Sequence, residues 1–201
     1  MKKGKRLLII FYRNPTLGRV KTRLAATLGD EKALAIYLIM ATHTKSMAEK
    51  VVTDKVIYYT DFVDLEDSWP NALFDKKIQR GEDLGKKMGN AFADGFRAGY
   101  QSICIVGTDC FELTSEIITE AFIKLEQLGA VIGPAKDGGY YLLGLTRLHP
   151  DVFKNKKWSN DTVFAETIKD FKKIGQHFFQ LEALTDVDEE KDLPEAFKKL
   201  L

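Results

Sequence analysis

The chain has 201 residues, of which 45% are hydrophobic and 29% charged, a composition typical of soluble globular proteins. Its 30 basic and 29 acidic residues leave a net charge of +1, which excludes a strong overall attraction to nucleic acids or membrane surfaces. No apolar stretch approaches the roughly 20 residues of a membrane span, and the N-terminus lacks a signal-peptide pattern. We therefore expect one domain, residues 1–201, in the cytoplasm, where Cys104 and Cys110 stay unpaired.

Apolar runs alternate with amphipathic segments along the chain. Strands are expected at 6–12, 55–60, 102–109, 130–133, 140–145 and 178–187. Helices are expected at 21–28, 30–50 with Asp30 as N-cap, 82–99, 114–129 between Thr114 and Gly129, 161–173 and 189–201, with a helical turn at Trp69-Pro70. The β-α-β-α-β order of the first part predicts a parallel sheet flanked by helices, and the closely spaced later strands predict a mixed sheet.

The strand that starts at Ser102 ends abruptly at Gly107-Thr108-Asp109. Ligands of open α/β sheets bind beyond the carboxyl ends of the strands, so Asp109 would project into a binding site. The alternative is that Asp109 only caps a turn, a role in which aspartate is common.

The loop after the first strand carries Arg13, Arg19, Lys21 and Arg23. A strand-to-helix loop offers free backbone N–H groups, and guanidinium groups match phosphate oxygens, so the loop predicts phosphate binding. A solvated basic helix start is the alternative, but cations there would oppose the helix dipole. The loop is neither a P-loop nor a GxGxxG dinucleotide motif, which argues against a kinase or an NAD enzyme.

Carboxylates beside a phosphate site indicate Mg²⁺ or Mn²⁺, which bridge to substrate phosphates. One carboxylate binds weakly, so Asp109 needs a second ligand. Asp186 and Asp188 are two residues apart and would share a face if extended. Their alternative role is to cap the helix expected after them. The three histidines are scattered and lack the spacing of a metal site.

Two further segments are candidates for acceptor binding. The turn Lys136-Asp137-Gly138-Gly139 lets a ligand approach the backbone, although a plain hairpin turn explains an Asp-Gly pair equally. The indole of Trp158 could cover a substrate or simply pack as an ordinary tryptophan.

Six segments, taken in order, resemble a bacterial glycosyltransferase-A-like (GT-A) family. They are FYRNPTLGRVKTRL, QRGEDLGKKM, IVGTDC, GPAKDGGYYLLGL, WSN and LTDVDEEKDL. This family is often labelled nucleotide-diphospho-sugar transferase, includes members associated with arsenosugar biosynthesis, and is related to the 2-phospho-lactate and molybdopterin guanylyltransferases. The resemblance spans residues 7–193 and implies a Rossmann-like, three-layer α/β/α sandwich that binds a nucleotide at the end of the first strand.

The residues and the resemblance together give the candidate site. The catalytic candidates are Lys21, Arg23, Asp109 and Asp137, and the metal ligands are Asp109, Asp186 and Asp188. Nucleotide binding is assigned to Arg13, Gly18, Lys21, Arg23, Gly81, Asp83 and Thr108. Acceptor binding is assigned to Gly138, Gly139, Tyr140, Trp158 and Ser159. The chain departs from the family pattern at Phe111, where proline is usual, and at Asn160, where threonine is frequent.

The first function expected is a glycosyltransferase that depends on Mg²⁺ or Mn²⁺ and uses a nucleotide-diphospho-sugar donor and a small-molecule acceptor. The metal would stabilise the departing diphosphate. The alternative is a nucleotidyltransferase that joins a nucleoside triphosphate to a phosphorylated acceptor and releases pyrophosphate. A non-catalytic nucleotide-sugar sensor is a third possibility. For an inverting mechanism the general base is Asp137 or Glu82, and the residues do not rank the two.

Overall fold

A computed structural model describes residues 5–158 and 160–200. The strands are β1 (Arg6–Tyr12), β2 (Asp54–Tyr59), β3 (Asp75–Ile78), β4 (Ser102–Val106), β5 (Ala130–Pro134), β6 (Tyr140–Leu145) and β7 (Phe179–Gln180). They form one sheet in the order β3-β2-β1-β4-β6-β5-β7. Strand β6 is antiparallel to both of its neighbours, and the other paired strands are parallel. The predicted mostly parallel, mixed sheet is confirmed.

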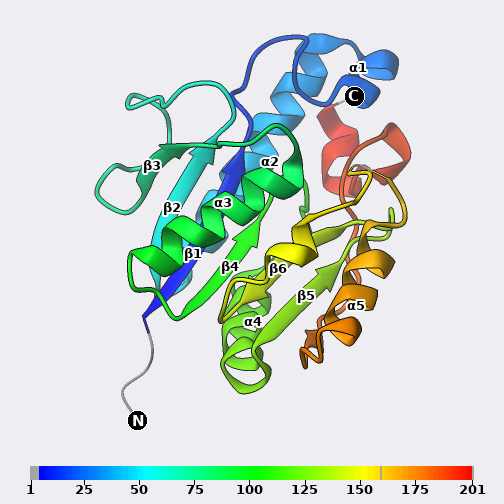
Figure 1. Ribbon diagram of the computed structural model, residues 1–201. Coiled ribbons are helices and arrows are strands. Elements are labelled where there is room, and N and C mark those ends of the chain that lie inside the picture. The colour runs from blue at the N-terminus through cyan, green and yellow to red at the C-terminus, as the bar shows by residue number, and fades with distance from the viewer. Residues whose placement is uncertain (1–4, 159, 201) are drawn as a thin grey trace.

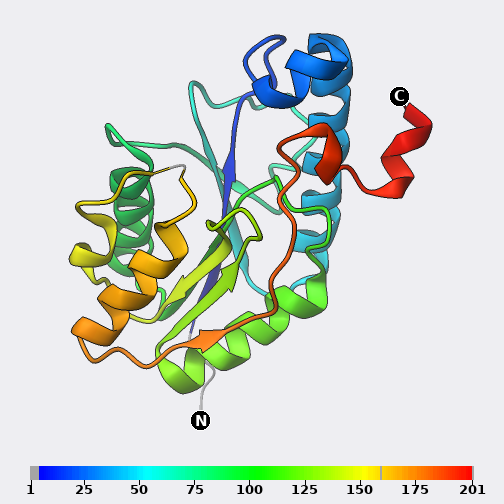
Figure 2. The same ribbon diagram turned by 90° about the vertical axis from the view of Figure 1, so that its right-hand side faces the viewer.

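The α-helices are α1 (Thr22–Leu28), α2 (Asp30–Lys50), α3 (Leu84–Arg97), α4 (Ser115–Leu128) and α5 (Val163–Lys173). The 3₁₀ helices are η1 (Pro150–Phe153), η2 (Glu190–Asp192) and η3 (Glu195–Leu200). Helices α2 and α4 cover one face of the sheet, and α3, η1 and α5 cover the other (Figure 1, Figure 2). The molecule is therefore the Rossmann-like α/β/α sandwich expected from the sequence.

Strand β1 shows why the sheet strands read as continuous apolar runs. Leu8 and Ile10 pack into the core beneath α2 and α4, whereas Leu7 and Ile9 pack into the core beneath α3 and α5. Successive side chains of a strand point to opposite faces, so a strand covered on both faces must be apolar at every position.

Helix α4 follows its sequence signals. The Thr114 side chain accepts a hydrogen bond from the Ile117 N–H at 3.3 Å, and Gly129 ends the helix in the left-handed conformation with φ of 85°. Cys104 and Cys110 are unpaired, as predicted, and both are buried, although Cys110 was expected to be a loop thiol. Within the described part of the chain, no helix is both long enough and apolar enough to cross a bilayer.

Two sequence predictions are wrong near the C-terminus. The late strand expected at 178–187 is reduced to β7 and two isolated bridges, one between Ala135 and Leu184 and one between Cys110 and Asp186. The helix expected from 189 is instead η2 and η3. Pro194 lies between them and, without an N–H, cannot continue a helical ladder.

Three smaller points complete the comparison with the predicted elements, one of them an agreement. Asp30 is the first residue of α2, and Gly29 takes the N-cap position. The expected turn at Pro70 forms, with its carbonyl accepting hydrogen bonds from the N–H groups of Leu73 and Phe74. Strand β3 escaped prediction because its sequence, Asp-Lys-Lys-Ile, is charged and mostly exposed on the sheet edge.

The N-cap of α4 provides a test of this local reading. Thr114→Ala leaves the first turn of α4 without its side-chain acceptor, so the free energy of unfolding should fall by about 1 kcal/mol. Thr114→Ser keeps the hydroxyl and should recover most of the loss. Urea denaturation of the three proteins measures both effects, and equal stability of the alanine and wild-type proteins would contradict the assignment.

Candidate active site

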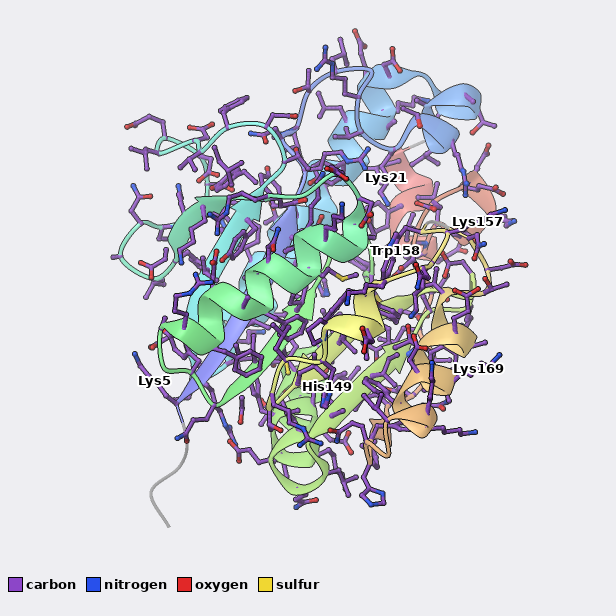
Figure 3. The ribbon with its side chains drawn as sticks, viewed as in Figure 1. Lys5, Lys21, His149, Lys157, Trp158 and Lys169 are labelled. Carbon is purple, nitrogen blue, oxygen red and sulfur yellow. The ribbon has the colours of Figure 1, made fainter. Side chains whose placement is uncertain are left out.

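A cavity of about 850 Å³ opens where β1, β2 and β4 end. Eleven of the residues singled out from the sequence line it: Arg13, Lys21, Arg23, Thr108, Asp109, Asp137, Gly139, Tyr140, Trp158, Asp186 and Asp188. Figure 3 shows Lys21 and Trp158 toward this edge of the sheet. The fold thus brings together candidates from five separate segments of the chain.

Buried polar groups fix the loop that follows β1. Asn14 is 2% exposed; its Oδ1 accepts a hydrogen bond from the Asp61 N–H at 3.0 Å, and its Nδ2 donates to the Phe62 carbonyl at 3.0 Å. The Tyr37 hydroxyl donates to the Arg13 carbonyl at 2.7 Å and accepts from the Arg13 N–H at 3.0 Å. The backbone of Arg13 is therefore held while its side chain stays exposed.

Lys21 is the most constrained residue of the site. It occupies the N-cap of α1 with φ of 49°, a left-handed conformation that costs a non-glycine residue roughly 1–2 kcal/mol. Its ammonium lies 2.6 Å from Asp109 Oδ1, 2.6 Å from the Val187 carbonyl and 3.5 Å from Asp188 Oδ1. The side chain is only 4% exposed. Its charge is held between two of the predicted metal ligands.

The C-terminal segment reaches Asp109 through backbone pairing. The Val187 N–H donates to the Asp109 carbonyl at 2.8 Å, and Cys110 and Asp186 form an antiparallel bridge. This pairing places Asp186 and Asp188 beside Asp109. Asp188 does not cap a helix, because Glu189 is the N-cap of η2.

Phe111, the departure from the family pattern, also holds this region together. Its ring lies 4.5 Å from the His43 ring and 4.7 Å from the Phe197 ring, measured between centroids. The substitution thus ties the residues after Asp109 to α2 and η3.

Asp186 is the most perturbed carboxylate in the cavity. Burial, together with the nearby negative charges of Asp109 and Asp137, raises its pKa to about 7, and the charge of Lys21 opposes this shift. Its Oδ1 is buried and has no hydrogen-bond partner in the described structure. A buried carboxylate oxygen without a hydrogen-bond partner is stabilised either by binding a proton or by a nearby cation.

The lining of the cavity is short of positive charge. It contains three cationic side chains, Arg13, Lys21 and Arg23, and five carboxylates, Asp109, Asp137, Asp161, Asp186 and Asp188. A polyphosphate would add more negative charge. Among the described residues no group of three or more His, Cys, Asp and Glu forms a ready-made metal cage. Mg²⁺ needs no such cage, because it binds through one or two carboxylates together with substrate phosphates and water. The residues present fit a metal of that kind.

Several predicted residues do not line the cavity. Asp83 is the N-cap of α3 and accepts a hydrogen bond from the Lys86 N–H at 2.7 Å. Glu82 pairs with Lys86 outside the cavity. Of the two candidate bases, only Asp137 therefore lines the cavity. Ser159 lies outside the described residues. Three glycines, Gly18, Gly81 and Gly138, shape loops in left-handed or glycine-specific conformations.

The structure also adds residues that the sequence pattern did not single out. Thr60 and Gln79 follow β2 and β3 directly, and Phe11, Met88 and Asp161 complete other parts of the wall. Gln79 opens one of the segments that carry the family resemblance, but its place at the end of a strand was not apparent because β3 was not predicted.

The sequence comparison assigns a family. The family described as "Uncharacterized protein conserved in bacteria (DUF2064)" matches residues 41–160, which is more than half of the chain. The chain belongs to this family. The matched range includes Asp109, Asp137 and Trp158 but not the basic loop or Asp186. No curated protein matches the chain.

Several solved structures have a fold similar to that of this DUF2064 member. A protein of Desulfovibrio desulfuricans G20, described as a candidate nucleotide-diphospho-sugar transferase, is 28% identical with a TM-score of 0.85, over 98% of this chain and 91% of that one. CMP:2-keto-3-deoxy-manno-octonic acid synthetase in complex with CTP is 12% identical with a TM-score of 0.54, over 98% and 96%. The inositol-1-phosphate CTP transferase of T. maritima is also 12% identical, with a TM-score of 0.51 over 100% and 96%. These last two similarities show the fold alone.

The raised pKa of Asp186 predicts a pH-dependent stability of the metal-free protein. From about pH 4 to about pH 7 the folded chain retains a proton that the unfolded chain has lost, so the free energy of unfolding falls across this range and then levels off. Asp186→Asn should remove the decline and raise the free energy of unfolding at pH 8 by roughly 1–3 kcal/mol.

Denaturant titrations at pH 5 and pH 8 in the presence of a chelator measure this difference. Asp161→Asn changes an exposed carboxylate of the same cavity and should leave the decline in place. An unaltered decline in Asp186→Asn would contradict the prediction.

Proposed function

We propose that this protein is a metal-dependent glycosyltransferase that uses a nucleotide-diphospho-sugar donor and a small-molecule acceptor. The observation that carries the proposal is the uneven distribution of charge within one cavity. Its three cationic side chains all come from the loop after β1 and the first residues of α1, whereas its carboxylates come from other segments.

The cationic side suits a diphosphate. Arg13 and Arg23 are exposed and can offer guanidinium donors to phosphate oxygens. Arg23 also lies 3.6 Å from Asp188 Oδ2, an exposed ion pair that leaves its other donors for a ligand. The Lys21 ammonium is already engaged by Asp109 and the Val187 carbonyl. We propose that Lys21 neutralises the carboxylates near the diphosphate. Lys21 could contact a phosphate itself only if it lost one of these two partners.

The part of the cavity lining that comes from α3, from β6 and the turn before it, and from residues 158, 160 and 161 does not suit a phosphorylated acceptor. It includes Leu84, Met88, Tyr140 and Trp158 together with Asp137, Asn160 and Asp161. None of these described residues is cationic, and two are carboxylates. A phosphate group placed there would meet negative charge and apolar surface, which is unfavourable. An uncharged acceptor is favoured, as glycosyl transfer to a hydroxyl group requires.

The residues then divide the reaction between them. Asp137 accepts the proton of the acceptor hydroxyl as that oxygen bonds to the anomeric carbon and the bond to the diphosphate breaks. Arg13 and Arg23 hold the departing diphosphate. A bound Mg²⁺ or Mn²⁺, held by Asp109 with Asp186 or Asp188, would supply further stabilisation of the charge that develops there.

The comparisons support transfer of a nucleotide or nucleotide-linked group at a general level. The D. desulfuricans relative is described as a candidate nucleotide-diphospho-sugar transferase, which agrees with the proposal. The cytidylyl-transferring neighbours keep nucleotidyl transfer as the second candidate, although they share only the fold. The association with arsenosugar biosynthesis stays a prediction from sequence resemblance.

The leaving product separates the two candidate reactions. Incubation with nucleotide sugars, nucleoside triphosphates and a panel of acceptors should release a nucleoside diphosphate and no pyrophosphate. Phosphate-specific detection after selective hydrolysis of each product makes the measurement. Release of pyrophosphate from a triphosphate would favour nucleotidyl transfer, and binding without turnover of any substrate would favour the sensor.

Asp109 tests the metal requirement. Asp109→Asn should lose at least about 100-fold in metal-dependent turnover, because a neutral amide is a weak ligand for a hard divalent cation. Its circular dichroism should match that of the wild-type protein. Asp151→Asn changes an exposed carboxylate outside the cavity and serves as the matched control. Full activity of Asp109→Asn would mean that Asp109 is only a turn residue.

A further inference from the structure

The indole of Trp158 lies directly on the backbone of α3. A Cβ added at Gly85, in the first turn of this helix, would lie 2.5 Å from Trp158 Cε2 and 2.5 Å from the Phe153 carbonyl oxygen. No real Cβ tolerates such distances. One turn later, a Cβ at Gly89 would lie 3.5 Å from the Phe153 ring, which is an ordinary van der Waals contact. Of these two glycines, only Gly85 is required for the position of the indole.

A glycine within a helix has a cost that calls for an explanation. Glycine loses more conformational freedom on folding than alanine, also in the first turn of a helix. The missing side chain at Gly85 lets the Trp158 indole pack against the backbone of α3. The half-buried indole then forms part of the cavity wall. Leu84 and Met88 of the same helix and Tyr140 of β6 extend this apolar wall.

The polar groups beside the indole have a common chemistry. Asp137, Asn160 and Asp161 line the same side of the cavity and carry carboxylate or amide oxygens, which accept hydrogen bonds from hydroxyl groups. The flat negative face of an indole attracts the weakly positive C–H groups of a ring lying on it. A ring with C–H groups on its faces and hydroxyl groups on its edge satisfies both kinds of surface, whereas a phosphate or carboxylate substituent satisfies neither.

We infer that Trp158 is the platform for an uncharged, polyhydroxylated ring, and that Gly85 is the positioning residue that sets this platform. The inference rests on the proposed function and names the chemistry that the cavity selects. The ring has two sources, the sugar of the nucleotide donor or a sugar-like acceptor. Both sources would use the same indole face and the same hydroxyl-accepting side chains.

Titration calorimetry with Mg²⁺ tests the inference through ratios of affinity. UDP is compared with UDP-glucose, and GDP with GDP-mannose, for the donor arm; methyl glycosides are added to the diphosphate-loaded protein for the acceptor arm. In one of these arms the wild-type protein should gain about three- to tenfold in affinity from the ring. Trp158→Ala and Gly85→Ala should reduce that gain to near zero without changing the affinity for the nucleoside diphosphate. Gly89→Ala, the matched control, should keep the gain.

Charge on the ring provides a second readout that a merely structural role would not change. In the arm that shows the gain, the glucuronate compound should bind several-fold more weakly than the glucose compound, because its carboxylate would meet the charges of Asp137 and Asp161. The pair is UDP-glucuronate and UDP-glucose in the donor arm, and methyl glucuronide and methyl glucoside in the acceptor arm. Thermal unfolding reports whether Gly85→Ala folds, and Trp158→Ala keeps the test valid if it does not. Two results would overturn the inference, provided that nucleoside diphosphates still bind. One is a gain in affinity from the ring that persists in Trp158→Ala, and the other is the absence of any such gain in both arms of the wild-type protein. Failure of every nucleotide to bind would overturn the proposed function as well.

Discussion

The rest of the site depends on the contacts of the Lys21 ammonium with Asp109, Asp188 and the Val187 carbonyl. This ammonium joins three segments that are distant in sequence: the start of α1, the turn after β4 and the C-terminal segment that runs past it. Without a cation at this point, Asp109 and Asp188 would repel each other in a partly buried pocket. The ammonium itself is buried whereas the two carboxylates are about half exposed, so removal of Lys21 would affect the arrangement of the site more than the overall stability of the fold. The left-handed backbone of Lys21 is the strain that this arrangement carries.

This neutralisation is incomplete, and the remaining charge explains the function proposed for the cavity. Three cations face five carboxylates, so a diphosphate gains strong partners only on the side of Arg13 and Arg23, or from a divalent metal. The other side of the cavity combines the Trp158 wall with hydrogen-bond acceptors and favours an uncharged group. One cavity thus separates the phosphate-bearing part of a substrate from its uncharged part, and the reacting bond would lie between them.

Much of the fold and part of the site could be predicted from local signals. The apolar run of β1 and the Thr114 and Gly129 signals of α4 each encode a structure by themselves. Asp109 was identified because the end of a buried strand marks the ligand-binding edge. The wall around Trp158 could not be found in this way, because the contact with Gly85 depends on how α3 packs against a distant loop. The ion pairs of Lys21 with Asp109 and Asp188 could not be predicted either, because the sequence of a loop does not show which carboxylates the fold brings close to it.

The central claim is that the two sides of the cavity bind chemically different parts of one substrate pair. A crystal structure of the protein with a nucleoside diphosphate, Mg²⁺ and a nonreactive nucleotide sugar tests it most directly. The account predicts the diphosphate against Arg13 and Arg23, and an uncharged ring against the Trp158 indole. A diphosphate bound beside Asp137 and Asp161, with the basic loop empty, would contradict it.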